Sequence, residues 1–354
     1  MFATLRNTLP RQLSRAYSTA AGGAKSGNGL LWASLATGGV LVGGRFPHTR
    51  SVHAWNIREH AKAQTLTPTT LHPQHVVQIG YYYTRSKEAQ TNEAPVTKAL
   101  DPKSFTPFKL KEKVPINHDT SLFRFELEPN QELGLDITSC FVVKAKLDGD
   151  EKPTIRPYTP VSPQHVRGHF DMVVKNYPQG KMSSHIHNLT PGDVLEIKGP
   201  IPKHPYKANE FKEIGMIAGG SGITPMLQLV QHVLADPNDH TKMTLVFANK
   251  SENDIILRST FDKFAQEHPD RFRVFYVVDK ASSADWKGET GYITKDMVKK
   301  YMPSPDQGNV LVSVCGPIPM MKLVSGAKAP DFSQGEVGGI FKELGYSSSQ
   351  VFKF

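Results

Sequence analysis

Two glycine-rich segments, about ninety residues apart, constrain the fold of this chain more than any other feature. They read Gly219-Gly220-Ser221-Gly222-Ile223-Thr224-Pro225-Met226 and Cys315-Gly316-Pro317-Ile318-Pro319-Met320. Each follows an apolar run and precedes a run of helical character, which predicts a strand, a tight turn and a helix. In such a unit, glycine lets the backbone approach a ligand closely, and the N–H groups at the helix start can bind phosphate.

The helix after the first segment is expected to have Thr224 as its N-cap and Pro225 at its first helical position. Pro225 stands where the third glycine of the Rossmann pattern G-x-G-x-x-G would be. A ligand-free turn would explain one such loop. Two loops at the ends of two strands of one sheet instead point to one crevice, where open α/β sheets bind ligands, and they favour a dinucleotide.

The positive charge of the chain is concentrated at its N-terminus. The formal net charge of the 354 residues is +9, but residues 1–58 contain seven Lys or Arg and no Asp or Glu. The remainder therefore has 35 basic residues against 33 acidic ones. With no interleaving of basic and aromatic residues, we expect no nucleic-acid partner, although a local basic patch could still dock an acidic one.

The cysteine and histidine patterns indicate neither a disulfide framework nor a metal site. The chain has two cysteines, Cys140 and Cys315, far apart and outside any C-x-x-C pattern. Its 14 histidines show no H-E-x-x-H spacing. We expect no bound metal.

The N-terminal region has the composition of a targeting segment followed by a membrane anchor. Residues 1–25 are rich in Arg, Ser and Thr and lack acids, as in a mitochondrial presequence. Residues 26–44 are uncharged and mostly apolar, just long enough to span a bilayer, which needs about 20 residues. The hydrophobic core of a secretory signal is the alternative. Residues 45–103 are polar and resemble a tether.

Residues 104–208 contain short alternating runs that predict an antiparallel β-barrel. The expected strands are 105–110, 122–127, 141–147, 170–175 and 194–198. Between them stands Arg156-Pro157-Tyr158-Thr159, in which a guanidinium could grip a phosphate and a ring could stack on a flat ligand. A proline-bounded surface turn is the alternative. Gly180-Lys181-Met182-Ser183 predicts a helix start, with Ser183 as a plausible cap, and a second anion site.

Taken in order, these four segments resemble those of NADH-cytochrome b5 reductases of the fungal mitochondrial type, within the ferredoxin-reductase-like flavoprotein superfamily. The resemblance covers about 104–354, whereas residues 45–103 match no segment of the family. It implies a two-domain fold, with the FAD-binding antiparallel β-barrel over 104–208 and a doubly wound α/β NADH-binding domain over 209–354. One departure is Asp136-Ile137-Thr138-Ser139-Cys140, where the family often carries Gly-Gln-His.

The resemblance also implies site residues. On the FAD side it implies binding of the pyrophosphate by Arg156, contacts to the flavin by Pro157, Tyr158 and Thr159, and binding of the diphosphate by Gly180, Lys181, Met182 and Ser183. Val173, Lys175 and Tyr177 match a segment lining flavin and nicotinamide, and Thr224 would approach the flavin. The NADH crevice would comprise Gly220, Gly222, Cys315, Gly316, Pro317, Met320 and the terminal Phe354.

Three further roles follow from the same resemblance. Asp279, at the end of an expected strand, would accept the ribose hydroxyls and favour NADH over NADPH. His118 would join a hydrogen-bond network near the flavin. Residues in the catalytic region are thus expected to be His118, Thr159, Lys175 and Cys315, with Cys315 as a positioning group and not a nucleophile.

The expected reaction passes hydride from NADH to FAD and then single electrons to cytochrome b5 or a similar acidic haem protein. There are two alternatives. One is a related diaphorase with a quinone or other acceptor, and the other is a membrane-tethered nucleotide-binding protein without turnover. We expect a monomer held by its N-terminal anchor in a mitochondrial membrane, the outer one favoured, with a cleaved intermembrane-space form as an option.

Overall fold

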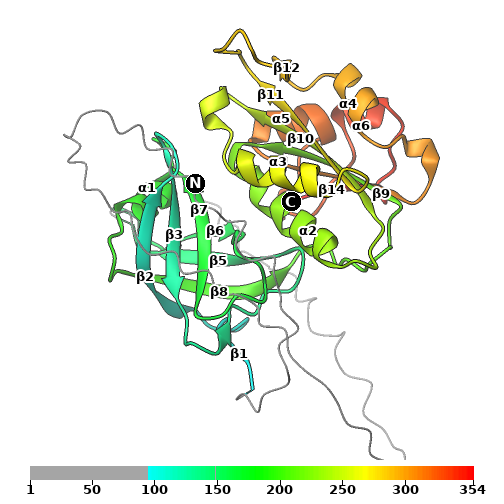
Figure 1. The fold of residues 1–354 in the computed structure, drawn as a ribbon. Coiled ribbons are helices and arrows are strands. Elements are labelled where there is room, and N and C mark those ends of the chain that lie inside the picture. The colour runs from blue at the N-terminus through cyan, green and yellow to red at the C-terminus, as the bar shows by residue number, and fades with distance from the viewer. Residues whose placement is uncertain (1–94, 148) are drawn as a thin grey trace, which may run out of the picture. The chain divides into compact units, whose positions relative to one another are not determined.

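The computed structural model describes residues 95–147 and 149–354 (Figure 1). No helix within these ranges has the length and apolar character needed to cross a membrane. The predicted presequence and anchor, residues 1–25 and 26–44, lie outside the described residues, as does most of the segment 45–103.

The N-terminal half of the described chain forms the predicted antiparallel barrel. Its sheet has the order β6-β5-β8-β2-β3-β7, and helix α1 contacts the two end strands, β6 and β7. The elements are β2 (Thr106–Pro115), β3 (Thr120–Glu126), β5 (Ser139–Ala145), β6 (Thr154–Tyr158), β7 (His169–Lys175), α1 (Lys181–Asn188) and β8 (Val194–Pro202).

Alternation along the barrel strands buries residues on both faces. Phe123 and Phe125 of β3 pack inside the barrel, whereas Leu122, directly before Phe123, belongs to a core shared with the second sheet. Val173 of β7 points to the same shared core, and its neighbours Met172 and Val174 point into the barrel. Because successive strand residues face opposite sides, one strand contributes to two cores.

Strand β6 was not predicted, because Pro157 reads as a strand breaker. In the structure, β6 lies at the edge of the sheet and pairs with β5 on one side. A proline is tolerated there because an edge strand leaves half of its N–H groups without a ladder partner.

The barrel's packing also extends N-terminal of residue 104. The short strands β1 (Thr97–Lys98) and β4 (Gln131–Glu132) pair in parallel, and Leu100 is buried in the barrel core. The N–H of Leu100 donates to the carbonyl of Leu133. Residues 97–101 therefore belong with the barrel and not with a tether.

The C-terminal half forms a parallel six-stranded sheet with the order β12-β11-β10-β9-β13-β14. The chain runs outward from β9 through β12 and then returns to the other side of β9 to form β13. The elements are β9 (Glu213–Gly219), α2 (Ile223–Ala235), β10 (Lys242–Asn249), α3 (Arg258–Glu267), β11 (Phe272–Val278), β12 (Glu289–Thr290), α4 (Lys295–Tyr301), β13 (Val310–Cys315), α5 (Ile318–Ser325), α6 (Gly339–Glu343) and β14 (Val351–Lys353).

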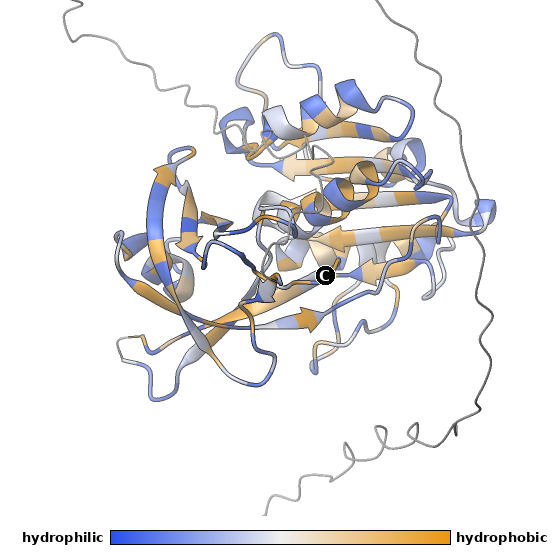
Figure 2. Ribbon diagram, turned by 60° about the horizontal axis from the view of Figure 1, so that its bottom comes forward, coloured by the Kyte–Doolittle hydropathy of each residue, from blue (hydrophilic) through white to orange (hydrophobic). Residues whose placement is uncertain are grey.

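Helices cover both faces of this sheet, as a doubly wound fold requires. Residues of α2 and α3 pack on one face and residues of α4, α5 and α6 on the other. The strands are coloured mostly as hydrophobic in Figure 2, because strands buried on both faces carry apolar side chains in both directions.

Helix α2 is buried along nearly its whole length because the barrel packs against it. Leu122, Val161 and Val173 of the barrel share a core with the sheet and α2. The amides of Gln228 and Gln231 donate to the carbonyls of Ser139 and Val161 at 3.2 and 3.3 Å.

Candidate active site

The two glycine-rich segments meet at the carboxyl end of the parallel sheet. Strands β9 and β13 are neighbours, with Cys315 opposite Ala218. A Cβ built on Gly222 would lie 2.3 Å from the carbonyl oxygen of Cys315, so the loops approach as closely as glycine permits. Since the strand order reverses between β9 and β13, this is the position at which open α/β sheets bind ligands. The two loops therefore meet at one edge of the sheet, as the sequence predicted.

The start of α2 differs from the prediction. A single 3₁₀ turn over Gly220–Gly222 precedes the helix, which begins at Ile223 with Gly222 at the N-cap position. Thr224 is therefore inside the first turn and nearly buried, and its hydroxyl donates to the carbonyl of Ser221 at 3.4 Å. The N–H of Ile223 donates to the carbonyls of Gly220 and Ser221, and no side chain caps the helix.

The helix start at Gly180 is also built differently than expected. Helix α1 begins at Lys181 after Gly180, and Ser183 lies within its first turn and does not cap it. The Ser183 hydroxyl donates to the carbonyl of Gly180 at 2.9 Å and accepts the N–H of Tyr177 at 3.1 Å. Ser183 thus ties the preceding loop to the helix. Met182 is buried in the barrel core.

The structure brings the two predicted FAD-binding segments together. Arg156 is exposed on β6, and its guanidinium donates to the carbonyl of Ile155 at 2.8 Å. Hydrogen bonds from Lys181 and Thr154, with the charge of Arg156 nearby, hold the pKa of Asp150 below its ordinary value. Arg156 and Lys181 therefore flank one carboxylate, which marks a local site for negative charge.

The remaining residues of the R-x-Y-T segment complete this surface. Pro157 is exposed on the barrel edge, and Thr159 follows the strand directly. Tyr158 is half-buried against the barrel core, and burial raises the pKa of its phenol to about 12. Its ring is therefore fixed and its hydroxyl stays protonated.

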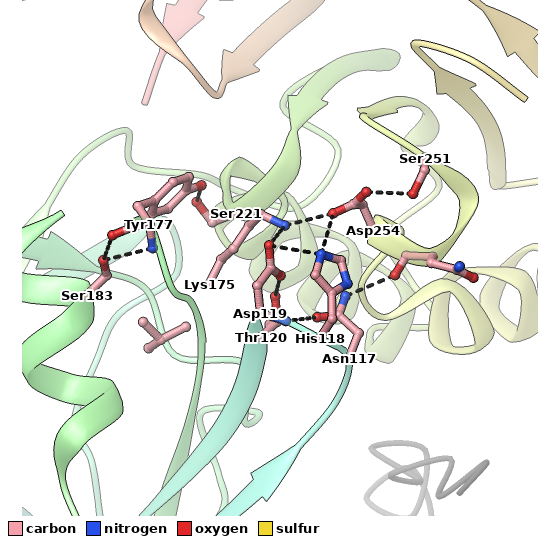
Figure 3. Close-up of polar contacts among 12 residues, drawn as sticks. Asn117, His118, Asp119, Thr120, Lys175, Tyr177, Ser183, Ser221, Ser251 and Asp254 are labelled. Carbon is pink, nitrogen blue, oxygen red and sulfur yellow. Dashed lines mark hydrogen bonds and ion pairs between the residues drawn. The ribbon is translucent and has the colours of Figure 1, made fainter. Parts of the chain in front are cut away.

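A polar cluster joins the barrel to the second sheet (Figure 3). The ammonium of Lys175 lies 2.5 Å from a carboxylate oxygen of Asp119 and 2.9 Å from one of Asp254. The imidazole of His118 lies 3.4 and 3.7 Å from the same two groups. Burial by itself would lower the pKa of Lys175, but the two carboxylates outweigh it and raise the pKa.

The end of β7 also reaches the glycine-rich loop. The hydroxyl of Tyr177 lies 2.8 Å from that of Ser221 (Figure 3). Val173, Lys175 and Tyr177 alternate along this segment and therefore present one face, which is the face toward the second sheet.

The cluster around Lys175 has ligand spacing that a metal could use. Among residues 95–147 and 149–354, His118, Asp119 and Asp254 are the group whose ligand atoms all lie within 4.8 Å of one another. The ammonium of Lys175 lies between the two carboxylates and already neutralises part of their charge.

The far end of the crevice contains a residue that the sequence reasoning missed. Asp279 is exposed at the end of β11, and its N–H donates to the carbonyl of Asn249. The pairing of β11 with β12 brings Gly291 beside Val278, so Tyr292 follows close to Asp279. Tyr292 is 76% exposed, and a base could stack on its ring. The signal available in the sequence was an aromatic residue, Tyr292, directly after a glycine, Gly291.

The second loop is tightly packed around Cys315. Burial raises the pKa of the Cys315 thiol to about 12, so the thiol is protonated at neutral pH. A Cβ on Gly316 would lie 2.6 Å from Met320, while Pro317 is exposed. The N–H of Phe354 donates to the carbonyl of Val314, which places the C-terminal ring next to the end of β13.

Comparison with known proteins identifies the class first. The family described as Oxidoreductase FAD-binding domain matches residues 107–206, and Oxidoreductase NAD-binding domain matches residues 216–326. The chain is thus a two-domain oxidoreductase of the ferredoxin-reductase-like fold.

Similar proteins identify the family within this class. The chain is 47% identical to an NADH-cytochrome b5 reductase-like protein of Arabidopsis thaliana, over 78% of this chain and 86% of the relative. It is 48% identical to NADH-cytochrome b5 reductase 2 of Mycosarcoma maydis, over 72% and 74%. The solved cytochrome b5 reductase domain of Ulva prolifera nitrate reductase is 34% identical with a TM-score of 0.63, over 73% of this chain and 100% of that domain. The chain belongs to the NADH-cytochrome b5 reductase family.

Proposed function

We propose that this chain takes hydride from NADH onto bound FAD and passes single electrons to cytochrome b5. The observation that carries the proposal is the junction between the two sheets: Lys175 and Tyr177 of the barrel contact Asp254 and Ser221 of the NAD-binding sheet. These contacts support an arrangement in which an FAD-binding barrel faces a nucleotide crevice. Family membership supplies the reaction class.

The residues of the barrel fit FAD. Arg156 offers an exposed guanidinium, and Lys181 offers an ammonium at the start of α1. A Cβ on Gly180 would lie 2.6 Å from the Ser183 hydroxyl, so the tight turn before the helix needs glycine. Arg156, Lys181 and the N–H groups of this turn would hold the pyrophosphate, while Tyr158 and Thr159 would line the ring system.

The crevice of the parallel sheet fits NADH. Gly222 and Gly316 let the two loops pack against each other, and the space beside Gly220 is open. A pyrophosphate would lie at these loops, with Thr224, Pro317, Met320 and Phe354 around it. Asp279 would accept the ribose hydroxyls of the adenosine half, and its charge would repel a 2′-phosphate. Tyr292 would stack on the adenine.

Bound FAD supplies the ability to accept two electrons as hydride and to release them one at a time. The contribution of the chain is orientation, since hydride transfer itself demands no acid–base pair. Val173, Lys175 and Tyr177 would border the reacting rings on the barrel side, with His118 in the polar network behind them. The protonated Cys315 thiol would pack beside the nicotinamide and position it.

We further propose that residues 1–25 direct the chain to mitochondria and residues 26–44 anchor it in a membrane, the outer one favoured. Residues 45 to about 96 would then form the tether, and the protein would act as a monomer. The composition of these segments supports this. A fusion of residues 1–44 to a fluorescent protein should co-localise with mitochondria and sediment with membranes after carbonate extraction. A soluble, diffuse fusion would contradict both assignments.

The test of the enzymatic proposal is an anaerobic absorption experiment on the detergent-purified full chain. The flavin band should bleach with NADH much faster than with NADPH, and added cytochrome b5 should then be reduced. Flavin reduction without cytochrome b5 reduction would favour a quinone or other acceptor. If no flavin copurifies and none can be restored, the chain is a nucleotide-binding protein without this activity.

A further inference from the structure

An ion pair links the two domains two residues before Tyr177, which contacts the glycine-rich loop. Lys175 and Asp119 belong to the barrel, whereas Asp254 belongs to a 3₁₀ turn, Glu252–Asp254, that follows β10 of the parallel sheet. The Lys175 and Asp254 side chains are only 11% and 10% exposed. An ion pair so shielded from water is screened little. Without Asp254, Lys175 would keep only Asp119 of the barrel as its partner, and the ionic link to the second domain would be lost.

Asp254 is held rigidly on its own side of the junction. The hydroxyl of Ser251 donates to its second carboxylate oxygen at 2.6 Å, and its N–H donates to the carbonyl of Ser251. Burial by itself would raise the pKa of Asp254, but Ser251 and Lys175 outweigh it and hold the pKa below its ordinary value. The carboxylate therefore stays ionised throughout the neutral range and presents a fixed oxygen to Lys175.

Neighbouring contacts follow the same line across the junction. The amide of Asn117 donates to the carbonyl of Asn253 at 3.0 Å, beside the ion pair (Figure 3). Two residues beyond Lys175, the hydroxyl of Tyr177 contacts Ser221 of the glycine-rich loop. The turn bearing Asp254 and the glycine-rich loop are thus both attached to the end of β7.

We propose that Asp254 is a positioning residue for hydride transfer: through Lys175 it sets the separation of the glycine-rich loop from the barrel. The inference rests on the proposed function, because that separation matters only if two rings must meet between the domains. Helix α2 holds the domains together elsewhere through Gln228 and Gln231, so loss of the ion pair should loosen this end of the junction without separating the domains. A misplacement of about 1 Å can slow a reaction by as much as about 100-fold.

The first measurement compares Asp254→Asn with the wild type as purified holoproteins. We expect full FAD content and an unfolding temperature close to that of the wild type. The rate constant of flavin reduction at saturating NADH should fall at least about tenfold, with a smaller change in the dissociation constant for NAD⁺. Hydrogen exchange should become faster in peptides covering 173–178 and 251–256. The matched control is Glu343→Gln, which removes an ion pair with Lys295 inside the second domain and should change none of these values.

A double-mutant cycle identifies the partner through which Asp254 acts. Lys175→Met should itself slow flavin reduction, and adding Asp254→Asn to it should cause little further loss, since the two residues form one unit. Asp254→Glu, which keeps the charge, should recover part of the rate. Unchanged flavin reduction and exchange in Asp254→Asn, or additive losses in the double variant, would overturn the inference. Tighter NADH binding by Asp254→Asn would also overturn the inference, because the ion pair would then hinder nucleotide binding. A wild type that NADH does not reduce would instead reject the proposed function.

Discussion

The α-carbon of Gly222 lies so close to the carbonyl of Cys315 that a Cβ on it would be 2.3 Å from the carbonyl oxygen. The φ angle of Gly222 is −64°, a value open to any residue. The need for glycine here is therefore steric and not conformational, because the two loops of the nucleotide crevice are in van der Waals contact through their backbones.

Gly222→Ala should separate the two loops and weaken NADH binding. The obstructing atoms are backbone atoms of Cys315 and Gly316, which cannot rotate away, so the loops must shift. We expect a KM for NADH raised at least about tenfold and stability lowered by about 1 to 3 kcal/mol, with FAD content unchanged. Steady-state kinetics and thermal unfolding measure both effects.

The control for this variant is Gly192→Ala, in the turn before β8. Gly192 has a φ of +103° and open space around a Cβ. Substitution should cost about 1 to 3 kcal/mol of stability through backbone strain alone. If it raised the KM for NADH as much as Gly222→Ala, the effect at Gly222 would reflect general destabilisation and not loop contact.

Arg156→Ala should release FAD. A guanidinium that grips a phosphate contributes about 1.5 to 3 kcal/mol per charged hydrogen bond, which predicts an affinity loss of about 100-fold. The FAD affinity of Arg156→Lys should lie between those of the wild type and Arg156→Ala, since an ammonium cannot bind in a bidentate manner. Flavin fluorescence after dilution and ultrafiltration measures the loss. Arg273→Ala, an exposed arginine of the second domain, should retain FAD, and retention by Arg156→Ala would reject the assignment.

The Cys315 thiol should be nearly inert toward iodoacetamide in the native protein. Burial raises its pKa to about 12, so the reactive thiolate is scarce at pH 8 and becomes abundant only in strongly alkaline solution. Alkylation followed by mass spectrometry should be at least about tenfold slower than in urea, where the ordinary pKa returns. Fast native alkylation of Cys315 at pH 8 would contradict this and would favour an activated thiol.

Asp239 should stabilise the linker between the two domains in a pH-dependent manner. It is buried and accepts the hydroxyl of Tyr206 at 2.6 Å and the N–H of Thr241 at 3.0 Å. Burial by itself would raise the pKa of Asp239, but these hydrogen bonds outweigh it and hold the pKa below 3.8. The stabilisation is therefore present above pH 3.8 and is lost as the pH falls through the folded-state pKa.

Asp239→Asn should accordingly lower the free energy of unfolding by about 2 kcal/mol at pH 7, and the difference from the wild type should shrink below pH 3.8. Urea unfolding at pH 7 and pH 3 measures the two differences. Asp270→Asn, at an exposed carboxylate, should match the wild type at pH 7. A difference for Asp239→Asn that grows on acidification would have the wrong sign for this account.

Signals within a short stretch of chain were sufficient for most of the fold. Alternating apolar residues predicted the strands that became β3, β5 and β7, and glycine with a following helical run predicted both loops of the crevice. The resemblance rested on the same local motifs, and relatives of 47% and 48% identity support it. Errors occurred where two local preferences conflict: Pro157 reads as a breaker but lies in an edge strand, and Ser183 and Thr224 read as caps but lie inside their helices.

Sequence by itself thus determined which segments are strands, loops and helices, because backbone propensity and side-chain period act over a few residues. Only the tertiary structure decided which segments meet. The contact of Gly222 with Cys315 depends on strand order, and the bridge from Lys175 to Asp254 spans 79 residues and two domains. Asp254 carries no local pattern that marks it, and the glycine turn before Tyr292 does not show which strand end that ring lies beside. Their neighbours are set by the packing of one sheet and one barrel, since contacts between distant segments follow from topology and not from the residues beside them in the chain.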